Sequence, residues 1–126
     1  MNGKIRKCRN RIESFKYAFA GIRATVMREK SFRFQIFCAI AAVIACIIFQ
    51  VDGWHFALVG FAIFFVLSME LMNTAIEAVV DLVAGQKSHP LAKMAKDAAA
   101  GAVLLASIFA LIVAGIVALD VVRRFI

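Results

Sequence analysis

Three long runs without a charged residue constrain this chain more than any other feature. They cover residues 34–51, 53–69 and 98–119, which are 18, 17 and 22 residues long. As helices they would span roughly 27, 26 and 33 Å, close to the ~30 Å hydrocarbon core of a bilayer. The runs predict three transmembrane helices, because a chain of 126 residues is too short to surround three such segments with a soluble shell.

The composition supports the same fold class. Hydrophobic residues make up 63% of the chain, against about 45–50% in an ordinary soluble protein. One proline and seven glycines leave little material for a turn-rich β fold, and the apolar content excludes a disordered chain. We expect an all-α membrane protein that forms a single membrane domain over residues 1–126.

The positions of lysine and arginine predict the orientation in the membrane. Ten of the 15 precede the first run, three lie between the second and third runs, and two end the chain. Basic residues are enriched on the cytoplasmic side, so the N-terminus and the 82–97 segment are expected there. We attribute the net charge of +7 to a membrane surface and expect no nucleic-acid partner.

The segment at 9–30 has an amphipathic pattern of its own. Its apolar residues recur at helical spacings of three and four, at Ile12, Phe15, Phe19, Ile22 and Val26. Basic residues occupy the other directions, which suits a helix lying on an anionic membrane surface. A cytosolic helix packed on the 82–97 segment is the alternative.

The second apolar run continues as a helix that carries a polar stripe. We expect membrane helices over about 34–51, 54–84 and 91–119, the last two with cytoplasmic extensions. Polar residues recur on one side of the second helix, at Glu70, Asn73, Thr74, Glu77 and Asp81. For Asp81, a solvated ion pair with Lys93 or Lys96 is the alternative to a functional role.

A depth argument places this stripe at the inner face of the membrane. If Trp54 lies in the outer aromatic belt with His55 as a second anchor, Glu70 is roughly 24 Å and Glu77 about 34 Å further along. Glu29 precedes the first run, and Lys96-Asp97 precede the third, at the same level. Acids near a membrane span cost free energy, which makes them functional candidates.

These residue types permit phosphoryl transfer. Glu29, Glu77 and the amide of Asn73 offer hard oxygen ligands that suit Mg²⁺ shared with phosphate. Lys96 could offset phosphate charge, and Glu70 could accept a hydroxyl proton. The known nucleotide-binding motifs are absent, so the residues alone predict only a site for a metal and an anion.

Three stretches resemble one protein family. ELMNTAIEAVVDL at 70–82, HPLAKMAKDAAAGAVLL at 89–105 and SFKYAFAGIRA at 14–24 are similar to the prokaryotic diacylglycerol kinase family of small membrane lipid kinases. The resemblance implies a homotrimeric bundle in a bacterial inner membrane, with an N-terminal amphipathic surface helix, three transmembrane helices and active sites shared between subunits. It also implies that Mg²⁺-bound ATP phosphorylates a membrane lipid alcohol.

Residue roles follow from the same resemblance. Glu70 resembles the family's general base, and Glu29 and Glu77 its metal-binding acids. The implied ATP-binding residues are Arg11, Tyr17, Glu29, Asn73, Glu77, Lys96 and Asp97. The implied lipid-binding residues are Ser14, Phe19, Arg23, Ser31, Gln35 and Glu70.

The lipid substrate has two candidates. The sequences SFKYAFAGI and HPLAKMAKD look more like the undecaprenol kinase branch, so undecaprenol is favoured over diacylglycerol. Against this, residues 32–35 read FRFQ where many undecaprenol-type members read FRIH. A small oligomeric channel or transporter is the non-enzyme alternative, but it would place polar residues along a whole span.

Overall fold

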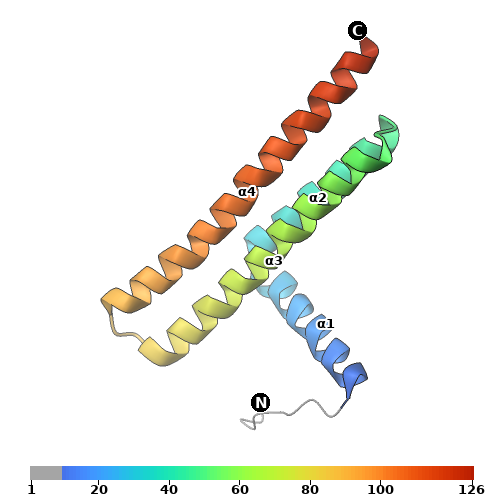
Figure 1. Cartoon of the computed structure of the whole chain (residues 1–126). Coiled ribbons are helices and arrows are strands. Elements are labelled where there is room, and N and C mark those ends of the chain that lie inside the picture. The colour runs from blue at the N-terminus through green and yellow to red at the C-terminus, as the bar shows by residue number, and fades with distance from the viewer. Residues whose placement is uncertain (1–9) are drawn as a thin grey trace.

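The computed structural model describes residues 10–126 as four α-helices (Figure 1). They are α1 (Arg11–Arg28), α2 (Lys30–Ile48), α3 (Gly53–Ala84) and α4 (Pro90–Phe125). Within the described residues every regular element is helical, and α2, α3 and α4 are long and apolar enough to cross a membrane. The prediction of an all-α chain with three such helices is therefore confirmed.

The observed helix bounds differ from those of the uncharged runs. The helix α2 begins at Lys30 rather than at 34 and ends at Ile48 rather than at 51, while α4 ends at Phe125 rather than at 119. An intrahelical hydrogen bond satisfies the backbone whether or not the side chain is charged, so hydropathy marks the span and not the helix end. Residue 9, where the first helix was expected to begin, lies outside the described residues.

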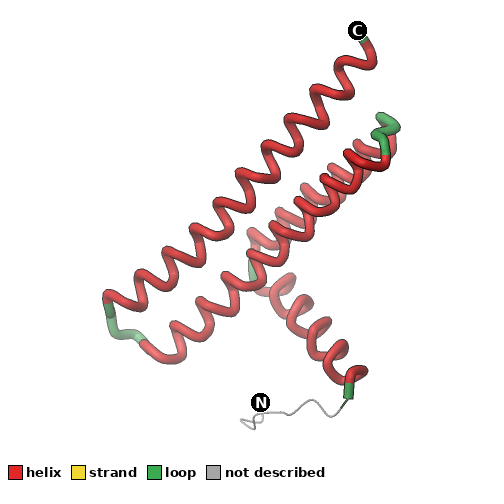
Figure 2. Tube along the Cα trace, viewed as in Figure 1, coloured by secondary structure: helices red, strands yellow, loops and turns green. Residues whose placement is uncertain are grey.

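A break at Glu29 separates α1 from α2. Glu29 has extended backbone angles (φ −106°, ψ 116°), while its N–H still donates to the Thr25 carbonyl at 2.8 Å. The guanidinium of Arg33 donates to the carbonyls of Val26 and Met27 at 2.8 and 3.3 Å. Arg33 thus satisfies two of the carbonyls that the end of α1 leaves without helical partners. Figure 2 shows the resulting corner, from which α1 runs away from the other helices.

The α2–α3 turn is fixed by a cap on the next helix. The Asp52 carboxylate accepts a hydrogen bond from the backbone N–H of His55 at 2.9 Å and lies 2.8 Å from the His55 ring Nδ1. These two hydrogen bonds, the backbone one first, lower the pKa of the Asp52 carboxyl below its ordinary value. Arg124, near the end of α4, donates to the carbonyls of Gln50 and Phe49, which ties the turn to the chain's C-terminal helix.

The α3–α4 connection follows ordinary helix-capping chemistry. Gly85 ends α3 with a φ of +61°, a conformation that glycine adopts without a Cβ penalty. His89 caps α4 by accepting the N–H of Leu91 at Nδ1 (3.1 Å), and Pro90 stands in the first helical turn. His89 and Pro90 therefore form the junction between the loop and α4.

The core of the bundle lies mainly between α3 and α4, which run side by side in opposite directions (Figure 1). Ala62, Val113 and Val117 form its buried cluster, and the ring of Phe109 meets those of Phe61 and Phe65 edge-on. An apolar groove of about 890 Å³ remains between α2, α3 and α4. Most large apolar side chains are exposed, as expected of a chain whose surface faces lipid or other subunits.

Candidate functional site

A buried carboxylate stands midway along α3, at the level where α1 meets α2. Glu70 lies on α3 and is only 6% exposed. Its carboxyl group interacts with the side chain of Ser31 and is close enough to Glu29 and Glu77 to feel their charge. The α1–α2 corner and the middle of α3 therefore bring three acids together.

Glu70 has no cationic partner among residues 10–126. No lysine, arginine or histidine nitrogen in that part of the chain lies within 4.0 Å of a Glu70 carboxylate oxygen. Burying a carboxylate without a counter-charge is costly, and packing does not require an acid at this position. The arrangement is typical of a group kept for a proton or a cation that arrives with a ligand.

Asn73 provides the test of whether a metal ion fits here. Its Nδ2 donates to Oε1 of Glu77 at 3.3 Å, one turn further along α3. Its Oδ1 is buried and has no hydrogen-bond partner within the described part of the chain. A buried carbonyl oxygen beside ionised carboxylates is the hard-ligand set that Mg²⁺ takes together with phosphate oxygens, so the residues present fit such an ion.

The neighbouring helix adds cations towards the α3–α4 connection. The Lys96 ammonium lies 2.6 Å from the Asp81 carboxylate and also interacts with the charge of Glu77. Lys93 pairs with Asp97 at 2.5 Å, one turn apart on α4. The ion pair that the sequence offered as the alternative for Asp81 is therefore present. A cleft of about 260 Å³ between the ends of α3 and α4 is lined by both pairs.

The predicted residues on α1 occupy a different place. The first turns of α1 point away from the bundle (Figure 1). Tyr17 is half-buried, whereas the other predicted α1 residues are exposed: Arg11, Ser14, Phe19 and Arg23. Gln35, on α2, lines the apolar groove. The single chain thus gathers Glu29, Ser31, Glu70, Asn73, Glu77 and Lys96, and leaves the first turns of α1 outside this group.

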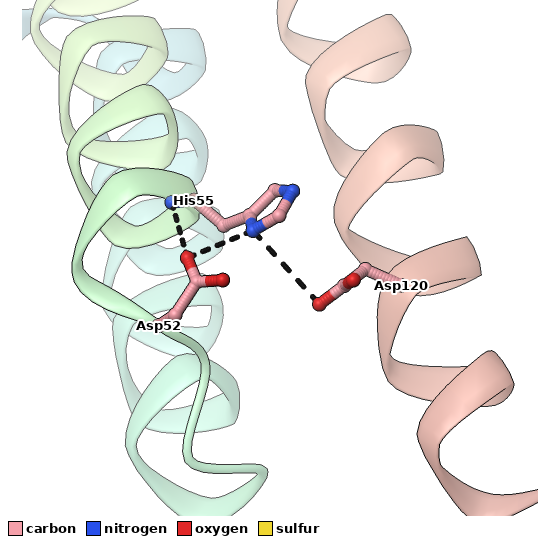
Figure 3. Close-up of side chains that lie close together, drawn as sticks. All are labelled: Asp52, His55 and Asp120. Carbon is pink, nitrogen blue, oxygen red and sulfur yellow. Dashed lines mark hydrogen bonds and ion pairs between the residues drawn. The ribbon is translucent and has the colours of Figure 1, made fainter.

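Sequence reasoning missed a second polar cluster at the other end of the bundle. Asp52, His55 and Asp120 each place one ligand-type atom within 4.8 Å of the others (Figure 3). Within residues 10–126 they form the one such trio, and the acids around Glu70 are more widely spaced. From the sequence alone, His55 is interpreted only as an interfacial anchor. The Asp-x-x-His spacing was visible, but the approach of Asp120 depends on how far α4 runs beside α3.

The fold and the site define a small helical membrane protein with an acidic polar site at one end of its bundle. A model of the prokaryotic diacylglycerol kinase family matches residues 16–118. The match covers most of the chain, so the chain belongs to this family.

Named relatives agree with the family. The chain is 43% identical over 106 residues to a diacylglycerol kinase of Synechocystis, an alignment that covers 84% of the chain but only 61% of that protein. It is 40% identical to an undecaprenol kinase of Bacillus subtilis, covering 80% of the chain and 81% of the relative. It is 38% identical to the diacylglycerol kinase of Escherichia coli, with 80% and 82% covered. The class is therefore that of the lipid kinases, which are transferases.

Proposed function

We propose that this protein transfers the γ-phosphoryl group of ATP to the hydroxyl group of a membrane lipid alcohol. The observation that carries the proposal is the buried Glu70 carboxylate, which faces Ser31, has no cationic partner among residues 10–126, and has two further acids beside it. A lipid hydroxyl at this level would meet Glu70, and the nucleotide would meet the more exposed Glu77, Lys96 and Asp97. Two family relatives' names, undecaprenol kinase and diacylglycerol kinase, describe kinases of membrane alcohols.

In the proposed reaction Glu70 takes the proton of the lipid hydroxyl. The hydroxyl oxygen forms a bond to the γ-phosphorus, the bond from that phosphorus to the β–γ bridging oxygen breaks, and ADP leaves with the electron pair. Because little covalent chemistry falls to the protein in phosphoryl transfer, its contribution is positioning and charge stabilisation. Lys96 supplies a positive charge near the phosphates, and Asp81 orients it through their ion pair.

Glu29, Glu77 and Oδ1 of Asn73 are the residues that would hold Mg²⁺. Such an ion, when bound with ATP, neutralises charge on the phosphate oxygens. Two observations support this assignment: Oδ1 of Asn73 has no hydrogen-bond partner within residues 10–126, and Nδ2 of Asn73 donates to Glu77. The Asn73 Nδ2 would keep the Glu77 carboxylate turned toward the ion.

We expect Glu29→Gln and Glu77→Gln each to weaken Mg²⁺-dependent nucleotide binding by roughly tenfold or more, because each removes an ionised ligand. Titrating a fluorescent ATP analogue at several Mg²⁺ concentrations measures this. The double variant should lose less binding free energy than the sum of the two, since both acids act on one ion. The Glu13→Gln variant changes the chain's one glutamate outside this group and is the matched control. An unchanged Mg²⁺ dependence in either single variant would remove that residue from the site.

For the substrate we propose undecaprenol, with diacylglycerol as the second candidate. The sequence of residues 14–22 and 89–97 supports undecaprenol, as does the similarity to the Bacillus subtilis relative. The Synechocystis and Escherichia coli relatives support diacylglycerol. Both lipids are long apolar alcohols, so the apolar groove alone does not separate them.

A direct assay decides between the two lipids. Purified protein in mixed micelles with Mg²⁺-ATP is offered undecaprenol and diacylglycerol separately, and kcat/KM is measured for each. We expect at least a tenfold preference for undecaprenol, because a site built around one alcohol leaves polar groups unpaired with the other. A preference for diacylglycerol would transfer the assignment to that lipid, and no turnover with either would contradict the proposed activity.

We further propose a bacterial inner membrane location, with the N-terminus and the active site on the cytoplasmic side, and a homotrimeric assembly. The orientation rests on the excess of basic residues before α2 and between α3 and α4. The assembly is supported by the exposed apolar surface of the single chain and by the direction of the first turns of α1, which point away from the bundle.

A further inference from the structure

We propose that Asp52, His55 and Asp120 form a binding site for a divalent transition-metal ion of the Zn²⁺ type. The three side chains come from the start of α3 and from the end of α4, and they point toward one another (Figure 3). The cluster lies about 22 Å along α3 from Glu70, as the 15-residue separation of His55 and Glu70 gives. The proposal rests on this cluster and is independent of the kinase reaction.

The spacing of the ligand atoms suits one small ion. His55 Nδ1 is 2.8 Å from Asp52 Oδ1 and 3.8 Å from Asp120 Oδ2, and all three atoms lie within 4.8 Å of one another. Ligands of a tetrahedral Zn²⁺ are about 3.4 Å apart when each is about 2.1 Å from the metal. The observed distances lie on both sides of that value, so small side-chain rotations suffice to close the site.

The donor types select the class of ion. One imidazole nitrogen with two carboxylate oxygens is a set that borderline metals such as Zn²⁺ accept, whereas Mg²⁺ and Ca²⁺ prefer oxygen alone. Two carboxylates balance the charge of a divalent ion. In the metal-free chain the Nδ1 proton can donate to Asp52; on binding, that nitrogen gives its lone pair to the metal and the proton resides on Nε2.

Neighbouring groups hold the three ligand side chains in place, and the cluster is accessible to an ion from solution. The Asp52 carboxylate also accepts the backbone N–H of His55, and Nε of Arg124 lies 3.7 Å from Asp120. Arg124 is itself bound to the carbonyls of the α2–α3 turn, so its ion pair with Asp120 helps to hold that carboxylate beside His55. The Asp52 side chain is 59% exposed, which leaves the cluster open to solution.

A bound ion would join the α2–α3 turn to the last turns of α4. These segments already touch through Arg124, and Val51 packs against the buried cluster that includes Val117 of α4. Metal binding to the folded state alone stabilises that state by mass action. A bound ion would therefore stabilise the contact between α3 and α4 at the end of these helices that is remote from Glu70.

Zinc binding to the full-length protein in detergent micelles tests the proposal. Protein treated with EDTA and then freed of it is titrated with Zn²⁺ in competition with a chromogenic chelator, and thermal unfolding is followed with and without Zn²⁺. We expect one ion per chain that depends on this cluster. The variants His55→Gln and Asp120→Asn should each weaken its binding by at least about tenfold and abolish the Zn²⁺-dependent rise in Tm.

The controls separate this site from other zinc ligands. His89→Gln changes the chain's other histidine, and Glu77→Gln changes an acid of the proposed kinase site; neither should alter this binding. Co²⁺ absorption provides a second readout, because thiolate binding by the cysteines would give a charge-transfer band that survives His55→Gln. Equal zinc affinity in the wild type and the His55→Gln variant, or no binding by the wild type, would overturn the proposal. If the His55→Gln protein does not fold, the Asp120→Asn variant decides in the same way.

Discussion

Replacing Glu70 by glutamine is expected to remove nearly all kinase turnover while leaving the protein folded. The substitution keeps the size of the side chain and removes its ability to accept a proton. General-base catalysis typically contributes 10²–10⁴-fold, so kcat should fall by about that factor. Initial rates of lipid phosphorylation at saturating Mg²⁺-ATP measure the loss.

For this variant, the loss of catalysis can be distinguished from a loss of stability or of nucleotide binding. Because Glu70 is buried without a cation within the described part of the chain, removing its charge should not destabilise the fold. The Tm of the variant is expected to equal or exceed that of the wild type. Nucleotide affinity should also be retained, since the assigned ATP-binding residues are untouched. A loss of kcat with unchanged Tm and unchanged nucleotide binding is the pattern that a catalytic base predicts.

Glu13→Gln is the matched control for this experiment. It makes the same chemical change in α1, at the one glutamate that has no assigned role. Turnover by the Glu70→Gln protein within a few-fold of the wild type would contradict the assignment of Glu70 as the base. An equal fall in the Tm of both variants would show that removing any of these acids destabilises the fold. That result would also contradict the assignment of Glu70 as the base.

The helices were predictable from the sequence because their signals are local. A run without charges marks a span, and Asp52, His89 and Pro90 mark helix starts by short-range capping. The polar stripe from Glu70 to Asp81 was also readable, since residues three and four apart share a helix face. Family motifs at 70–82 and 89–105 then indicated the lipid kinases, in agreement with the family match over 16–118.

Contacts between helices were not predictable in the same way. The pairing of Lys96 with Asp81 rather than Lys93 depends on the register of α3 against α4, which no single-helix pattern fixes. The approach of Asp120 to His55 depends on the same register at the opposite end. Nor does the sequence state where α1 points after the corner at Glu29, since the corner is held by Arg33 reaching back to two carbonyls.

The second prediction with a large expected effect concerns how subunits share the active site, and it follows from the direction of α1. The single chain brings Glu29 and Glu77 to Glu70, but the first turns of α1 point away from that group. If Arg11 and Tyr17 bind the nucleotide as proposed, they must do so in the site of a neighbouring copy. A ring of identical subunits in head-to-tail contact permits this arrangement.

Mixing two inactive proteins is expected to restore activity when their defects lie in different halves of the site. One partner carries Glu70→Gln and the other carries Arg11→Ala with Tyr17→Ala, and subunits are exchanged in detergent before assay. In a trimer mixed at random, a site that takes its acids from one chain and α1 from the next is intact about one time in four. The mixture should therefore recover about a quarter of wild-type activity, measured against each protein alone.

The control mixture combines Glu70→Gln with Glu77→Gln. Both acids lie on α3 of one chain and interact with each other, so no exchange of subunits can rebuild an intact pair and this mixture should stay inactive. Recovery in the control would mean that the two acids of a site come from different chains. Failure of the first mixture to recover, or full activity of the α1 variant by itself, would contradict a site completed by α1 of the neighbouring subunit.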